Sequence, residues 1–178
     1  MTSASDSELV ELASGGDEGA FTCLLERHYD LIFKIAFKWC GDRDEAEDIA
    51  QDVCVKLVRG IRSFDHRSKF QTWLYRVTIN TAKDRSKVRK RYVPEAQVEF
   101  AAAASNPEPV TEPERYVALN RAFDGLNALP AKLRDAVMLV YVDDLSHKEA
   151  AEVLGCAETT ISWRIFKARR KLKAIWSV

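Results

Sequence analysis

The stretch LSHKEAAEVLGCAETTISWRIFKARRKL, residues 145–172, decides the fold of the C-terminal part of the chain. Ser146 and Glu149 have the S-x-x-E spacing of a capping box, which predicts that a helix begins here. Gly155 follows the last apolar residue of this short helix and can adopt the left-handed conformation that ends it. A second helix is expected from about Glu158. This pattern predicts a helix-turn-helix, whose second helix can lie in a DNA major groove.

The second helix of this motif has an apolar side and a polar side. Apolar residues recur at i, i+4, i+7 and i+11 and predict a buried face formed by Ile161, Ile165, Ala168 and Leu172. Hydroxyl groups on the other side can bond base edges or phosphates, and lysine or arginine can neutralise phosphate. A helical hairpin with a charged surface is the alternative, but no acidic residue follows Glu158. The residues predicted to bind DNA are Thr159, Thr160, Ser162, Trp163, Arg164, Phe166, Lys167 and Arg170, flanked by Arg169.

The remainder of the chain also predicts helices, since no sustained period-two alternation of apolar and polar residues indicates a strand. Residues 7–92 are expected to hold four helices, with helices over 17–40, over 44–62 and from Phe70 into a basic cluster, and a polar loop over 63–69. Pro130 is placed to start a further apolar helix in the C-terminal part, after a helix that carries Tyr116, Leu119, Phe123 and Leu126.

Residues 93–113 separate the two helical parts and contain AAAA and four prolines, which is typical of a flexible linker. The predicted fold is therefore all-α, with two small helical domains, residues 1–93 and 114–178, joined by a flexible acidic linker over residues 94–113.

Composition excludes several classes of protein. Of 178 residues, 47% are hydrophobic and 30% charged, which is too apolar for general disorder. No stretch reaches the roughly 20 apolar residues of a membrane helix, and the polar start MTSASDSELVE does not resemble a signal peptide, so a cytosolic protein is expected. Four scattered cysteines and three isolated histidines predict neither a metal site nor disulfides. We expect no catalytic residues, no cofactor and no small-molecule substrate.

The formal net charge of zero hides a strong segregation of charge along the chain. Residues 94–114 carry five glutamates and no lysine or arginine. Such segregation is typical of a nucleic-acid-binding protein, although a basic helix face alone would also fit a solvated surface. The two basic clusters are Lys83, Arg85, Lys87, Arg89, Lys90 and Arg91, and Arg164, Lys167, Arg169, Arg170, Lys171 and Lys173.

Three motifs resemble the extracytoplasmic-function sigma factors of the sigma-70 family. GDRDEAEDIAQDVCVKL, residues 41–57, is similar to the polymerase-binding helix of the family's second region. FQTWLYRVTINTAKDRSKVRKR, residues 70–91, resembles its W-L-x-x-I/V-x-x-N-x-x-x-D-x-x-R/K-x-x-x-R signature. Ala128-Leu129-Pro130, Arg134 and TISWRIFKAR, residues 160–169, match the fourth region. The signature residues are Trp73, Leu74, Val77, Asn80, Asp84, Lys87 and Arg91.

The resemblance implies a subunit that binds core RNA polymerase and directs promoter-specific initiation. The C-terminal domain would recognise the −35 element of promoter DNA, and the N-terminal domain the −10 element. Holding a strand open without catalysis requires cations for phosphate and aromatic or shaped pockets for extruded bases. Residues predicted to do this are Phe64, Lys69, Phe70, Trp73, Arg76, Asn80, Lys83 and Lys87, although Trp73 taken alone also fits a core position.

Contact with polymerase is predicted for residues outside the apolar stripe of the helix over 44–62. The family implies that these residues meet the clamp helices of the largest polymerase subunit; the alternative is a solvated acidic helix start. The linker is implied to run toward the active-site and RNA-exit channels, and an anti-sigma factor protein to be a further partner. The predicted polymerase contacts are Asp44, Asp48, Gln51, Asp52 and Val55.

Three positions depart from the family pattern. Ser162 stands where a basic residue is common, Trp163 where a small one is common, and Ala150 where a larger aliphatic residue is usual. The first two lie in the recognition helix, so promoter preference cannot be transferred from a relative.

Three other classes of function fit the sequence less well. A repressor or activator that binds DNA alone would leave residues 7–92 unexplained. An enzyme would need a nucleophile, metal or phosphate-loop constellation that the sequence lacks. A sigma-mimicking regulatory protein would not need both basic clusters.

Overall fold

The computed structural model describes residues 4–92, 122 and 124–176, and every regular element within them is helical. The chain divides into two compact units, Met1–Ala101 and Ala102–Val178. The all-α prediction with two sigma-type domains is confirmed, whereas the predicted linker over residues 94–113 lies outside the described residues.

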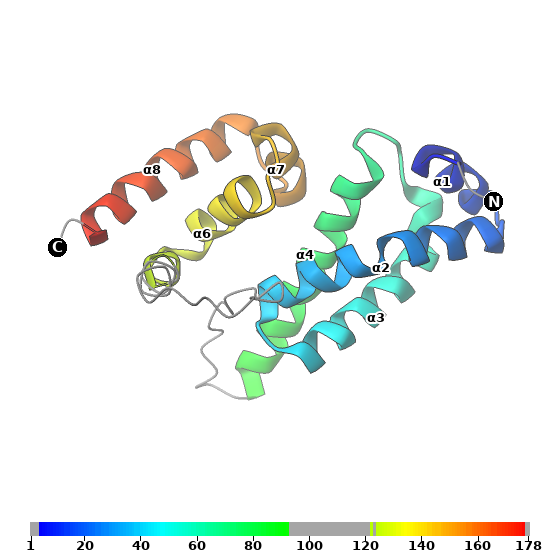
Figure 1. The fold of residues 1–178 in the computed structure, drawn as a ribbon, viewed down its shortest axis with the longest axis horizontal. Helices are drawn as coiled ribbons and strands as arrows, with labels where there is room; N and C mark the ends of the chain where they lie inside the picture. The colour runs from blue at the N-terminus through cyan, green and yellow to red at the C-terminus, as the bar shows by residue number, and fades with distance from the viewer. Residues whose placement is uncertain (1–3, 93–121, 123, 177–178) are drawn as a thin grey trace, which may run out of the picture. The chain divides into compact units, whose positions relative to one another are not determined.

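The N-terminal unit contains the four expected helices (Figure 1). α2 is the central helix, because α1, α3 and α4 all pack against it. A short 3-10 turn, η1, continues α3 and packs against α1. The bounds are α1 Asp6–Ser14, α2 Glu18–Cys40, α3 Arg43–Gly60, η1 Ile61–Ser63 and α4 Phe70–Tyr92.

Local sequence signals set the helix boundaries in this unit. The Asp17 side chain accepts a hydrogen bond from the Ala20 amide and caps α2. Gly41 adopts the left-handed conformation, with φ 78°, and ends α2. Asp42 then caps α3 by accepting from the Glu45 amide.

The apolar stripe expected on the helix over 44–62 is buried as the inner face of α3. Its residues are buried against α2 and α4, which fixes the opposite, acidic side of α3 toward solvent. In α2, Leu24, Ile35 and Trp39 are buried, and Phe21 and Leu31 are half-buried. The buried face of α3 and η1 consists of Ala46, Ile49, Ala50, Val53, Leu57 and Ile61.

The C-terminal unit is built on α6, α7 and α8, with α8 packed against both of the others (Figure 1). The Ser146–Glu149 capping box is present, and Gly155 ends α7 with φ 62°. The predicted buried face of α8 is confirmed at all four positions, Ile161, Ile165, Ala168 and Leu172. The bounds are α6 Ala131–Val137, α7 His147–Leu154 and α8 Glu158–Trp176.

The helix expected to follow Pro130 differs from the prediction at its C-terminal end. α6 gives way to a π-helical turn, η2, at Met138–Val142, in which the Asp143 amide donates to the Met138 carbonyl over 3.0 Å. The wider turn changes the phase of the following side chains. Tyr141 is therefore 51% exposed and bonds Arg169 of α8.

The helix expected to carry Tyr116 through Leu126 lies largely outside the described residues. Residues 122 and 124–127 are described, and they are helical.

Candidate nucleic-acid and protein interfaces

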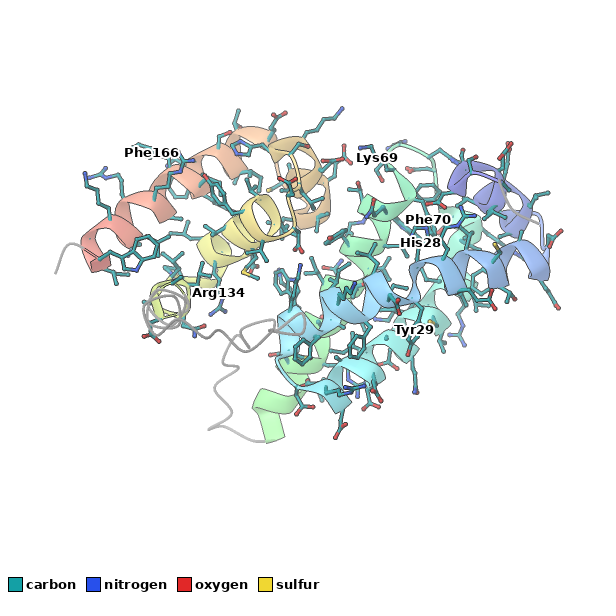
Figure 2. All side chains as sticks on the ribbon, viewed as in Figure 1. His28, Tyr29, Lys69, Phe70, Arg134 and Phe166 are labelled. Atoms are coloured by element: carbon teal, nitrogen blue, oxygen red, sulfur yellow. The ribbon has the colours of Figure 1, made fainter. Side chains whose placement is uncertain are left out.

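The outward side of α8 presents aromatic rings paired with cations. Trp163 and Phe166 are 52% and 58% exposed and lie on the same side of the helix. The Lys167 ammonium lies 4.3 Å from the Trp163 ring centroid, and the Arg170 guanidinium lies 5.8 Å from that of Phe166. Figure 2 marks Phe166 on this helix. These pairs give α8 a surface with both positive charge and flat apolar area.

The remaining predicted residues of α8 lie around the same surface. Thr159 and Ser162 are exposed, while Thr160 and Arg164 are half-buried. The Ser162 hydroxyl lies 2.9 Å from Nδ1 of His147, the first residue of α7, and 3.3 Å from the Glu158 carbonyl. The structure therefore brings together all eight predicted residues and adds His147, which the sequence did not single out because it lies 15 residues away along the chain.

In the N-terminal unit, three predicted aromatic residues form a buried cluster. Phe64, Phe70 and Trp73 are 8%, 7% and 9% exposed, with ring centroids 5.3–5.9 Å apart. Such separations are those of favourable aromatic pairs. The cluster holds the 63–69 loop against the start of α4. Trp73 therefore occupies a core position, which was one of the two positions that the sequence allowed for it.

Helix α1 is linked to this aromatic cluster through His28 of α2, which contacts both. The Asp6 carboxylate lies 2.8 Å from His28 Nε2 and 2.6 Å from an Arg27 nitrogen. The His28 ring packs edge-on against Phe70, at 5.4 Å between centroids, and Figure 2 shows the two side by side. This link between α1 and the loop was not predicted, because its members are distant in sequence.

A surface cavity of about 500 Å³ opens beside the cluster. α1 contributes Asp6 and Ser7 to its wall, and the loop and the start of α4 contribute His66, Lys69 and Phe70. Polar groups, one cation and an aromatic edge thus surround a space of the size that small ligands occupy.

Further along α4, the predicted polar residues lie outside the core. Arg76, Asn80 and Lys87 are exposed, and the Lys83 ammonium lies 4.8 Å over the Trp39 ring. The Lys87 ammonium also pairs with Asp84 at 3.1 Å. The cluster's later members, Arg89, Lys90 and Arg91, have side chains outside the described residues.

The solvent side of α3 carries all five residues predicted to meet polymerase. Asp44, Asp48, Gln51 and Asp52 are exposed, and Val55 is 57% exposed. Three of them, Asp44, Asp48 and Asp52, line a cavity of about 660 Å³ between α3 and α4.

Arg85 of α4 also belongs to this surface, although the sequence did not predict this. Arg85 was placed in the basic cluster, but its guanidinium lies 2.7 Å from Asp48 and 2.5 Å from Asp52. The only sequence signal was the i, i+4 spacing of the two carboxylates, which cannot identify a partner on another helix. Arg85 thus ties α4 to the acidic side of α3.

Among the described residues, no helix is long and apolar enough to cross a membrane. Within the same residues, no group of three or more metal-ligating side chains gathers at one point.

Comparison with known proteins matches both units. The family described as Sigma-70 region 2 matches residues 24–92, and Sigma-70, region 4 matches residues 121–172. RNA polymerase sigma-H factor of Pseudomonas aeruginosa is 32% identical, over 97% of this chain and 94% of that protein. ECF RNA polymerase sigma-E factor of Escherichia coli K12 is 32% identical, over 94% and 92% of the two chains.

Two solved structures share the fold across most of the chain. CnrH in complex with the cytosolic domain of CnrY has a TM-score of 0.68 and 26% identity, covering 97% of both chains. The sigma factor RpoE in complex with the anti-sigma factor NepR, from Bartonella quintana, has a TM-score of 0.67 and 26% identity, covering 89% of this chain and 97% of the other.

Proposed function

This chain belongs to the sigma-70 family as an extracytoplasmic-function sigma factor, and from that premise we propose which of its surfaces perform each step of initiation. It is a transcription initiation factor that binds core RNA polymerase and directs promoter-specific initiation. Because its partner polymerase acts on the bacterial chromosome, we place it in the cytoplasm, and we assign it no enzymatic activity of its own.

The −35 element is read by the outward side of α8. The main support for this assignment is that Trp163 and Phe166 are exposed beside the cations Lys167 and Arg170. The other side of the same helix is buried. Lys167 contacts phosphate, Ser162 approaches a base edge, and Trp163 packs on the sugar–phosphate wall or a thymine methyl. Thr159, Thr160 and Arg164 complete the contact surface.

The −10 element is opened by the N-terminal unit, domain 1–93. Lys69, Arg76, Asn80, Lys83 and Lys87 contact the backbone of the separated strand. Phe64, Phe70 and Trp73 support the loop from the inside, and the cavity beside Phe70 receives an extruded base. Buried aromatic residues thus act through the shape of the loop more than by direct stacking.

Core polymerase binds the solvent side of α3. Asp44, Asp48, Gln51 and Asp52 supply negative charge, and exposed Val55 supplies apolar contact at the same surface. The acidic linker over residues 94–113 runs toward the nucleic-acid channels of polymerase, where RNA later displaces it.

Reconstitution tests the function. Holoenzyme formed from core polymerase and this chain should give run-off transcripts from a subset of a genomic promoter pool. The isolated chain should show no tight, specific gel shift on the same duplexes, whereas a repressor would. Absence of transcripts, while a control sigma factor works, would refute the proposal.

Control by an anti-sigma factor follows from the same premise, and the structural neighbour RpoE was solved with one. We propose that an anti-sigma protein binds both units of this chain and hides their polymerase-facing surfaces. Affinity capture of the chain from resting cells should recover the anti-sigma protein together with it. Recovery of polymerase alone, in both resting and stressed cells, would contradict it.

A further inference from the structure

The pairing of His147 with Ser162 restricts what the recognition helix can accept from DNA. A serine hydroxyl has one hydrogen to donate and two lone pairs that accept. Isolated serine can therefore bond base donors and base acceptors alike. Ser162 is not isolated, since its oxygen lies 2.9 Å from His147 Nδ1 and 3.3 Å from the Glu158 carbonyl.

Each protonation state of the imidazole leads to the same result. If Nδ1 carries no proton, the hydroxyl donates its hydrogen to Nδ1, and both oxygen lone pairs remain. If Nδ1 carries a proton, it donates to the hydroxyl oxygen, and the hydroxyl hydrogen turns to the Glu158 carbonyl. One lone pair then remains. In both arrangements the hydroxyl hydrogen of Ser162 is bonded within the protein, and at least one lone pair of its oxygen remains free to accept a hydrogen bond.

We infer that His147 is a positioning residue that makes Ser162 an acceptor-only reader of the −35 element. In the major groove, adenine N6 and cytosine N4 are donors, whereas guanine O6 and N7 and thymine O4 are acceptors. The base that faces Ser162 is therefore adenine or cytosine. The inference rests on the proposed function, because it needs α8 in the major groove.

Holoenzyme binding to promoters substituted at each −35 base pair tests the inference. The position read by Ser162 is the one whose preference disappears in Ser162→Ala. There, the original chain should favour adenine or cytosine on one strand by about tenfold, a factor worth about 1.4 kcal/mol. His147→Ala leaves only the Glu158 carbonyl to hold the hydrogen, and at 3.3 Å that contact is longer than an ordinary O–H···O bond. The variant should therefore relax the preference toward guanine and thymine at that position alone.

Two further variants separate positioning from general structural damage. His147→Asn places an amide close to the position of Nδ1 and should restore the preference. In a Ser162→Ala background, His147→Ala should have no further effect on base choice. Lys148→Ala, at the neighbouring exposed residue, is the matched control and should leave base preference unchanged.

Several outcomes would overturn the inference while leaving the proposed function intact. They are a Ser162-dependent preference for guanine or thymine, no Ser162-dependent position at all, or an unchanged preference in His147→Ala. An equal effect of His147→Ala with and without the Ser162 hydroxyl would also overturn it. Holoenzyme that binds no promoter specifically would instead refute the proposed function, and the inference with it.

Discussion

Lys167 illustrates how one side chain can serve affinity without serving sequence choice. Its ammonium rests over the Trp163 ring at 4.3 Å, which holds a long, flexible cation in one direction. A phosphate contact stabilises every sequence equally, because the backbone charge is the same at each step.

We therefore expect Lys167→Ala to weaken holoenzyme binding at all promoters and to lower the log–log salt slope by about 0.9. Binding measured across a salt series on single-base promoter variants checks this. Lys167→Arg, which keeps the charge, should keep the slope. A change of preference at one base pair with an unaltered slope would reverse the roles assigned to Lys167 and Ser162.

Gly155 matters for its backbone conformation. It ends α7 at φ 62°, and a Cβ built there meets no atom within 4 Å, so backbone strain is the whole cost of a side chain. Gly155→Ala should lower the free energy of unfolding by about 1–2 kcal/mol. Gly155→Asn, which tolerates the left-handed region, should cost less in urea unfolding followed by circular dichroism. Equal costs would mean that the turn adopts another conformation.

At the scale of the element, α3 has two roles on one surface. Asp48 and Asp52 pair with Arg85 of α4, so the carboxylates that are proposed to meet polymerase also join two helices. Asp44 lies on the same side, yet among the described residues its side chain makes no hydrogen bond or ion pair. The chain thus offers a matched pair of substitutions.

Asp44→Asn should weaken binding to core polymerase and lower the free energy of unfolding by only about 0.3 kcal/mol, because it removes a negative charge from the first turn of α3 but breaks no pair. Asp52→Asn should weaken that binding too, and should lower the free energy of unfolding by about 0.5–1 kcal/mol, because the lost pair is partly exposed. Polymerase titration and urea unfolding of both variants provide the measurements. If neither variant alters polymerase affinity, the acidic side of α3 is not the interface.

Helix α1 shows how an element outside the matched region can shape a site. The Sigma-70 region 2 match begins at residue 24, but Asp6 of α1 holds His28 against Phe70 and forms part of the cavity wall. The periodicity of residues 7–92 indicated a helical domain and could not indicate this link. A hydrogen bond between residues 22 positions apart depends on how α1 packs on α2.

At the scale of the whole molecule, the domain boundaries stay a prediction, and limited digestion can test them. Five glutamates lie between residues 94 and 114, so a glutamate-specific protease should cut there first. Mass spectrometry should then identify two fragments near residues 1–93 and 114–178, both helical by circular dichroism. Early cleavage at Glu26 or Glu149, inside described helices, would contradict this organisation.

The sequence by itself determined most of the described helices, the capping box of α7, the buried faces of α3 and α8 and the family of the chain. These features depend on residues a few positions apart, such as Ser146 with Glu149 or Ile161 with Ile165, and short-range spacing is written directly in a sequence. The phase change at Met138–Val142 was missed, because a π-helical turn has no comparable signal.

The tertiary structure alone decided which polar groups meet across helices. Arg85 reaches Asp48 and Asp52, His28 reaches Phe70, and His147 reaches Ser162. It also decided that Phe64, Phe70 and Trp73 turn inward, since aromatic residues at a loop can serve either a core or a surface. Each of these contacts depends on the register of one helix against another, which side-chain packing sets and which no local pattern encodes.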